Sequence, residues 1–245
     1  MQLALKTYCP QGPIPDAGKD VVLIHGTGAR AEMWQPQIDL LVDAGYRCFV
    51  PDLRGHGETH EPGEKTDLES HIKDILETLS CCDLRYPAVF AGHSLGSIIS
   101  LVLAERQPEI FDKVLAVSMP GRVPALTSEI FRWFLGWPYK AIKSAQLHKH
   151  LAWRERVLID TNHYTLQQIV SNFSTIDYSR NIPRPSCPVH FAVGRLDPVA
   201  PYVHVERMHK ALPNSTLQVF EWAGHNCMDS QPEAFNKWFF EKLEQ

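Results

Sequence analysis

The chain has 245 residues, 44% of them hydrophobic, which suits one large core with room for an inserted subdomain. A net charge of −4 and the lack of long Lys/Arg runs exclude a general attraction to nucleic acid. The six cysteines lack zinc-site spacing, the N-terminus lacks a signal-peptide core, and no apolar run approaches the roughly 18 residues of a membrane span. We therefore expect a reduced, cytoplasmic protein without a transmembrane segment.

Taken from the N-terminus, short apolar runs alternate with amphipathic segments. Strands are predicted at 21–24, 47–50, 87–91, 114–117, 189–193 and 217–220, and only a brief strand fits before them. Helices are predicted at 31–42, 67–79, 97–105, 203–212 and 233–243. This alternation predicts an α/β protein whose mostly parallel sheet is covered on both faces. Functional residues are then expected in the loops at the carboxyl ends of the strands.

The stretch Gly92-His93-Ser94-Leu95-Gly96 lies between a buried strand and an apolar helix. A serine at a strand-to-helix turn, with glycine two residues to either side, is typical of a nucleophile elbow. The turn strains the serine backbone and exposes its hydroxyl, and a side chain at either glycine would collide with the neighbouring strand or helix. The alternative is a Gly/Ser turn of an α/β protein without catalysis.

A nucleophilic serine needs a base, and the base needs an orienting carboxylate. His225 directly follows the last predicted strand, and Asp197 directly follows the strand before it. His25, Asp52 and Ser94 also lie just beyond strand ends, so the reactive residues gather where an α/β sheet places function. The chain order Ser, Asp, His is the order of an α/β-hydrolase.

The chain resembles the α/β-hydrolase fold family, in its serine esterase, lipase and carbon–carbon hydrolase branch. The segments that carry the resemblance are 25–28, 52–57, 92–96, 194–199 and 224–225. It covers roughly residues 20–120 and 177–245, and it implies a Ser nucleophile rather than the Asp of epoxide hydrolases and haloalkane dehalogenases. Ser94 would attack an acyl carbonyl, His225 would move its proton, and Asp197 would orient His225. Backbone N–H groups of Leu95 and, by resemblance, Thr27 would form the oxyanion hole.

Other polar residues near these segments have structural interpretations. His93 is expected to pack beside the site, and His25 and His56 are expected to stabilise loops by hydrogen bonds. Asp52 is a rival to Asp197, but its loop matches a structural turn, and Cys227 is read as a buried thiol. No His or acidic cluster has metal-ligand spacing and no glycine-rich phosphate loop is present, so neither a metal nor a cofactor is predicted.

The strand pattern breaks over residues 121–174, where helices are predicted at 126–135, 139–148, 151–159 and 165–173. The resembling family inserts a lid over the serine here, so we expect an α/β-hydrolase core at 1–120 and 175–245 and a helical lid at 121–174. Over residues 121–160, seven Lys/Arg face three Asp/Glu, a net charge of +4. The lid is either an amphipathic cap with solvated charges or a surface that attracts an anionic substrate or lipid.

The predicted function is a serine hydrolase that cleaves a small, largely apolar carboxylic ester through an acyl-enzyme intermediate. A thioesterase or carbon–carbon bond hydrolase with the same triad, and a lid-switching ligand receptor of the same fold, are the alternatives. The expected partners are a small-molecule ester and, through the lid, a weakly bound membrane surface. The expected substrate contacts are Gly26, Trp34, His93, Phe131, Trp133, Phe134 and Trp137.

Overall fold

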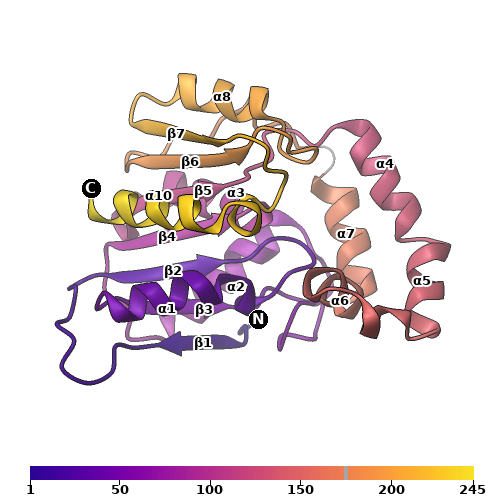
Figure 1. Ribbon diagram of the computed structural model, residues 1–245, viewed down its shortest axis with the longest axis horizontal. Coiled ribbons are helices and arrows are strands. Elements are labelled where there is room, and N and C mark those ends of the chain that lie inside the picture. Colours follow the sequence, from indigo (N-terminus) through magenta and orange to yellow (C-terminus); the bar gives the residue numbers. More distant parts are fainter. Residues whose placement is uncertain (174–175) are drawn as a thin grey trace.

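Within residues 1–173 and 176–245, which the computed structural model describes, seven strands form one sheet in the order β1-β3-β2-β4-β5-β6-β7 (Figure 1). The strands are Leu5–Tyr8 (β1), Asp20–Ile24 (β2), Arg47–Pro51 (β3), Ala88–His93 (β4), Phe111–Val117 (β5), Val189–Gly194 (β6) and Ser215–Phe220 (β7). β1 pairs antiparallel with β3 at one edge, and the remaining neighbours are parallel. The predicted mostly parallel α/β sheet is confirmed.

Helices cover both faces of the sheet because successive strand residues point to opposite sides. Val22 and Ile24 of β2 belong to one core, which they share with α2 (Leu68–Ser80), α3 (Leu95–Arg106) and α8 (Tyr202–Ala211). Val21 and Leu23 belong to the other, which they share with α1 (Gln35–Asp43) and α10 (Pro232–Glu244). Both cores are continuous apolar clusters, so the central strands are buried on both sides.

Proline and capping residues explain where two of the predicted helices begin. The predicted helix 31–42 begins as a 3₁₀ turn, Ala31–Trp34, and becomes α1 at Gln35 with Pro36 in its first turn, where the missing N–H is tolerated. The Asp67 carboxylate caps α2 by accepting the Ser70 N–H at 2.8 Å. A short helix, α9 (Cys227–Ser230), was not predicted.

Between β5 and β6 lie four helices of the described chain: α4 (Ala125–Phe134), α5 (Trp137–Ser144), α6 (Trp153–Asp160) and α7 (His163–Phe173). We call these helices and their connections the helical insertion; it lies beyond the carboxyl ends of the parallel strands (Figure 1). The predicted helix 139–148 has the wrong bounds, because α5 begins at Trp137 and Gln146 adopts a left-handed φ of 55° before a 3₁₀ turn, Leu147–His150. The predicted boundary at residues 174 and 175 lies outside the described residues.

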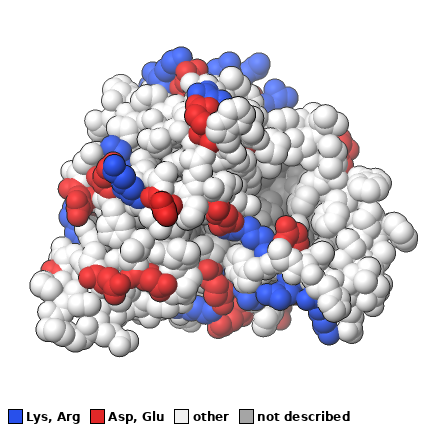
Figure 2. All heavy atoms as spheres, in the orientation of Figure 1, with Lys and Arg blue, Asp and Glu red and all other residues white. Residues whose placement is uncertain are grey.

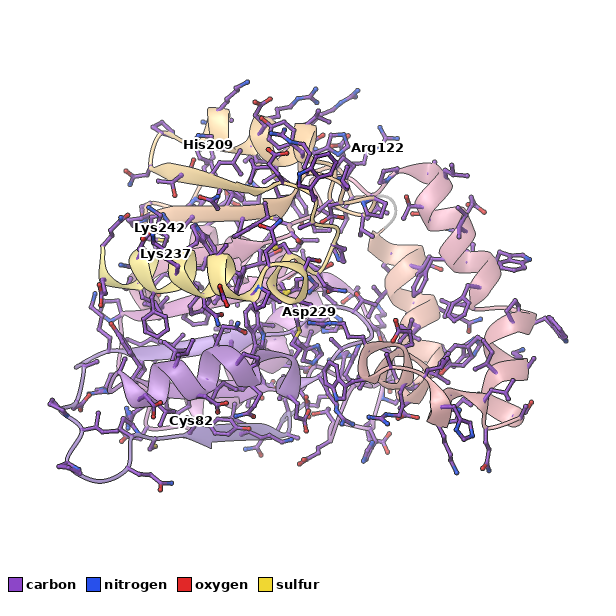
Figure 3. The ribbon with its side chains drawn as sticks, in the orientation of Figure 1. Cys82, Arg122, His209, Asp229, Lys237 and Lys242 are labelled. Atoms are coloured by element: carbon purple, nitrogen blue, oxygen red, sulfur yellow. The ribbon has the colours of Figure 1, made fainter. Side chains whose placement is uncertain are left out.

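The helical insertion has a small core of its own and several hydrogen bonds to the sheet domain. Leu135, Tyr139, Ile159 and Leu166 are buried together. Two hydrogen bonds attach the insertion to the sheet domain. The Asn162 N–H donates to the Gly55 carbonyl at 2.9 Å, and the Thr127 hydroxyl donates to the Pro198 carbonyl at 2.9 Å. Arg154 of α6 also pairs with Asp229 of α9, which Figure 3 labels on the sheet domain toward the insertion. Across the described residues, every helix is too short or too polar to traverse a bilayer.

Candidate active site

Ser94 occupies the sharp turn between β4 and α3 with a φ of 51° and a ψ of −112°. A positive φ is strained for serine and exposes the hydroxyl above the sheet. A Cβ atom at Gly96 would collide with the Ile24 carbonyl of β2, and one at Gly92 would collide with the backbone of Gly96 and Ser97 in α3. The strand, the strained turn and the two glycine requirements therefore occur as predicted from the sequence.

His225 reaches Ser94 from the loop after β7. Its Nε2 lies 3.0 Å from the Ser94 Oγ, and its Nδ1 lies 3.0 and 2.9 Å from the two carboxylate oxygens of Asp197. The carboxylate accepts the Nδ1–H, which leaves Nε2 to accept the serine hydroxyl proton. Asp197 is 4% exposed and also accepts the N–H groups of Val199 and Ala200 at 2.8 Å. These donors fix the carboxylate, so serine, histidine and aspartate form one hydrogen-bonded chain.

Two backbone amides stand at the serine with no acceptor of their own. Leu95 opens α3, where the first N–H groups lack intrahelical partners, and Thr27 lies in the loop after β2. In the part of the chain that the structure describes, neither N–H donates to a backbone or side-chain acceptor, and both residues line the cavity at Ser94. Their free donors are available to a substrate oxygen.

His25 and His56 hold the loops around these amides. The Nδ1–H of His25 donates to the Gly26 carbonyl and its Nε2 accepts the Leu53 N–H; the Nε2 of His56 accepts the Gly28 N–H. Burial lowers the pKa of His25 to about 4 and that of His56 to about 3, so both rings are neutral. Their predicted loop-stabilising role is confirmed.

Asp52, the rival carboxylate, is engaged by the backbone of its own region. It accepts the Ala31 N–H at 2.7 Å and the Glu58 N–H at 2.9 Å, and burial raises its pKa. The carboxylate that contacts His225 is Asp197. Asp52 instead connects the backbone near Ala31 to the backbone near Glu58. Cys227 is buried as predicted, and burial raises the pKa of its thiol to about 12.

His93 contacts the base directly. Its Nε2–H donates to the His225 carbonyl at 3.1 Å, and the two ring centroids are 4.9 Å apart. Burial holds the pKa of His93 well below its usual value, so the ring is neutral. Gly26 makes room for it, since a Cβ there would lie 2.7 Å from the His93 Nδ1.

An apolar cavity of about 260 Å³ opens at Ser94. Within the described residues, Asp, Glu, Lys and Arg are absent from its lining, which comes from Ser94 and α3, from the loops after β2, β6 and β7, and from the segment between β5 and β6. Phe131, one of the expected substrate contacts, lines this cavity. The sequence analysis did not identify the other insertion residues in the wall, which are Thr127, Ser128, Leu158, Ile169 and Val170.

Several aromatic residues predicted as substrate contacts lie elsewhere. Trp34 is fully buried in the sheet core, 6.2 Å from the Phe239 ring, because it packs under α1 and α10. Phe134 packs inside the helical insertion. Trp133 and Trp137 point to solvent, with 70% and 79% of their surface exposed. The structure therefore does not bring these four residues to the apolar cavity.

A second hollow of about 230 Å³ also borders His225. It shares Thr27, Leu158 and His225 with the apolar cavity. Its remaining lining is more polar and consists of Gly28, Ala29, His93, Trp153, Arg154, Glu155 and Asn226. His225 thus borders both an apolar space and a more polar one.

The sheet order, the strained elbow serine and the histidine that reaches it from the loop after the last strand place the protein among the α/β hydrolases as a structural class. The family model described as "Alpha/beta hydrolase family" matches residues 21–238, and the chain belongs to that family.

Similar proteins cover almost the whole chain. A non-heme chloroperoxidase from Streptomyces lividans is 27% identical over 252 residues, which span 91% of this chain and 90% of that protein. An esterase from Exiguobacterium antarcticum superposes with a TM-score of 0.84 at 19% identity, covering 99% of this chain and 96% of the esterase. An enol-lactonase from Burkholderia xenovorans gives 0.82 at 20% identity, with coverages of 98% and 96%. The two structures share the fold.

Proposed function

We propose that this protein is a serine hydrolase that cleaves small, largely apolar carboxylic esters through an acyl-enzyme intermediate. The observation that carries the proposal is the 3.0 Å approach of the His225 Nε2 to the Ser94 Oγ, in line with the Asp197 carboxylate and at the mouth of an uncharged cavity. The family supplies the hydrolase class, and relatives that include an esterase and an enol-lactonase support an acyl substrate.

Each residue then has one role in the reaction. The Ser94 Oγ attacks the ester carbonyl carbon while His225 takes the hydroxyl proton, and Asp197 stabilises the resulting imidazolium. The N–H groups of Leu95 and Thr27 donate to the oxyanion of the tetrahedral intermediate. His225 returns the proton to the leaving alcohol, and the same residues then activate water against the acyl-enzyme.

The two spaces beside His225 receive different parts of the substrate, the acyl chain and the alcohol. The apolar cavity accepts the acyl chain, since it holds Ser94 and, among the residues that the structure describes, has no charged side chain to pair with an ionised acyl group. Its 260 Å³ is below the roughly 300–1,000 Å³ of pockets for drug-sized ligands, which favours a short acyl chain. The alcohol leaves through the polar hollow, because His225 must protonate the leaving oxygen.

The helical insertion serves as the lid of this site. Phe131 of α4, Leu158 of α6 and Ile169 of α7 form one wall of the apolar cavity, so the insertion excludes water from the acyl group. The hydrogen bonds that Asn162 and Thr127 donate to the sheet domain hold that wall in place over the serine.

Active-site labelling with a fluorophosphonate, followed by turnover of an ester and thioester panel, tests the proposal. Wild type and Ser100→Ala, which alters a buried serine bonded to Gly96, should label, whereas Ser94→Ala should not. Ser94→Ala should also lose on the order of 10³-fold or more in ester turnover. Labelling that survives Ser94→Ala contradicts the assignment. Labelling without appreciable turnover of any ester, together with a ligand-induced thermal shift, would favour a receptor.

A further inference from the structure

Helix α4 presents two different faces. Its inner face carries Thr127, Ser128 and Phe131 to the wall of the apolar cavity. Its outer face exposes an apolar stripe that continues into α5 and consists of Leu126 (73% exposed), Ile130 (57%), Trp133 (70%) and Trp137 (79%). Residues spaced three and four apart share one side of a helix, so the outer face of α4 is continuously apolar in water. We call these four residues the outer stripe.

The outer stripe lies where another surface can reach it. α4 packs against α7, and both α4 and α5 stand at the end of the molecule farthest from the sheet (Figure 1). Figure 2 shows that this end of the molecule is largely free of charged side chains, with Lys and Arg gathered toward its lower edge. Large exposed apolar patches with a polar rim are typical of interaction sites.

The charged residues in the segment that carries the outer stripe are mostly basic. Over residues 125–150, the only acidic residue is Glu129, and the basic ones are Arg132, Lys140, Lys143 and Lys149. Arg132 is half exposed, and its guanidinium lies 3.9 Å from the Glu129 carboxylate, which is a weak surface pair. The outer stripe is thus accompanied by a net positive charge.

We propose that the outer stripe docks on an anionic lipid surface. Trp rings settle at the boundary between headgroups and acyl chains, and Lys and Arg beside them meet lipid phosphates. A second copy of the chain is the competing occupant, but a two-fold contact through this face would press two net-positive surfaces together. The inference rests on exposure and charge and holds whatever reaction Ser94 performs.

Co-sedimentation of the full chain with phosphatidylcholine vesicles, with and without phosphatidylglycerol, tests the proposal. We expect pelleting with the anionic vesicles at low salt and little with the neutral ones. High salt should weaken the binding, because charges at a surface are screened over about 8–10 Å at moderate ionic strength. Each engaged basic residue changes the partition coefficient by about fivefold, so reversing two of them should lower it by more than tenfold.

Two pairs of variants separate lipid docking from general surface effects. Trp133→Ser with Trp137→Ser should lose binding, whereas Trp222→Ser, at an 86% exposed Trp outside the insertion, should retain it. Arg132→Glu with Lys140→Glu should lose binding, whereas Lys237→Glu with Lys242→Glu on α10, on the far side of the molecule (Figure 3), should retain it. Unchanged melting temperatures show that all variants fold.

Three results would overturn the proposal. The first is equal or negligible pelleting of wild type with both kinds of vesicle. The second is equal binding by the stripe variants and their controls. The third is a wild-type dimer in sedimentation velocity that becomes a monomer in the Trp133→Ser, Trp137→Ser variant, which would assign the outer stripe to a second copy.

Discussion

His93 donates its Nε2–H to the main-chain carbonyl of His225 across 3.1 Å, so the residue before Ser94 holds the backbone of the histidine that contacts the Ser94 hydroxyl. This contact joins the last residue of β4 to the loop after β7. Because the ring of His93 is buried and neutral, it positions His225 without competing with it for a proton.

His93→Phe keeps a flat ring in the same space but removes the donor. We expect kcat for small esters to fall about 3- to 10-fold, the equivalent of one hydrogen bond, while KM changes little. His93→Gln, which restores an N–H donor, should recover part of the loss. Steady-state kinetics of both variants make the comparison. An unchanged kcat in His93→Phe would show that the contact does not position the base.

The two carboxylates at the strand ends should differ sharply in their effect on the reaction. Asp197→Asn should lower kcat by up to about 10⁴-fold with little loss of substrate binding, because the asparagine spoils the tautomer and charge support of His225. Asp52→Asn should act mainly on stability, since Asp52 accepts the backbone N–H groups of Ala31 and Glu58. Kinetics and urea unfolding of both variants are the measurements. A catalytically dead Asp52→Asn beside an active Asp197→Asn would reverse the assignment.

Gly96→Ala should distort the turn at Ser94 on the side that packs against β2. The new Cβ would collide with the Ile24 carbonyl, which belongs to the backbone of β2 and cannot rotate away. Overpacking of this kind costs about 1–3 kcal/mol of unfolding free energy, and we expect labelling of Ser94 to fall with it. Gly224→Ala is the matched control, because no atom lies within 4 Å of a Cβ at that position. Equal stability of the two variants in urea would contradict the close packing of α3 against β2.

Stability should fall on mild acidification because of buried neutral histidines. The pKa of His56 is about 3 in the folded protein and about 6.5 in an unfolded chain, so between these values unfolding takes up a proton. The contribution of His56 to stability is therefore complete above pH 6.5 and declines as the pH drops toward 3. His56→Gln, which keeps an acceptor for the Gly28 N–H, should flatten this slope by up to about 1.4 kcal/mol per pH unit.

Urea unfolding at several pH values below neutrality makes this measurement. His60→Gln, at an exposed histidine of the same loop region, is the matched control for the loss of an imidazole. An identical pH dependence in wild type and His56→Gln would show that the ring is not held neutral.

Phe131 should set the acyl length that the enzyme accepts. Phe131→Ala enlarges the apolar cavity, so kcat/KM for longer acyl esters should rise relative to that for the shortest, by about tenfold or more. Trp133→Ala, two residues along α4 but facing solvent, should leave the ratio unchanged. A panel of p-nitrophenyl esters of graded acyl length measures it. Equal effects of both substitutions would argue against the cavity as the acyl site.

The sequence predicted the sheet and located Ser94, Asp197 and His225 because their positions follow from local rules. Buried parallel strands are recognisable in a sequence as short apolar runs. Glycine is required at positions 92 and 96 of the elbow because backbone atoms lie within a few ångströms of where a Cβ would be. The 3₁₀ start of the helix at Ala31 and the break at Gln146 were missed, since Pro36 and a left-handed residue redirect the backbone without changing the apolar pattern.

The division of aromatics in α4 could not be predicted. Phe131, Trp133 and Phe134 lie within four positions, and each residue turns the helix by about 100°. Which of them faces inward depends on where α7 packs, and that contact joins segments distant in sequence. Trp34 shows the same limit, because its environment is created by Phe239, some 200 residues away.

Because the two faces of α4 have different environments, substitutions on each face can have separate effects during evolution. Positions 127, 128 and 131 line the apolar cavity at Ser94, whereas the side chains at positions 126, 130 and 133 are exposed to solvent. On the proposed function, substitutions on the inner side would change which acyl groups fit the cavity while the outer side stayed the same, and the reverse would hold equally. One ten-residue helix would then carry two traits that selection could change separately.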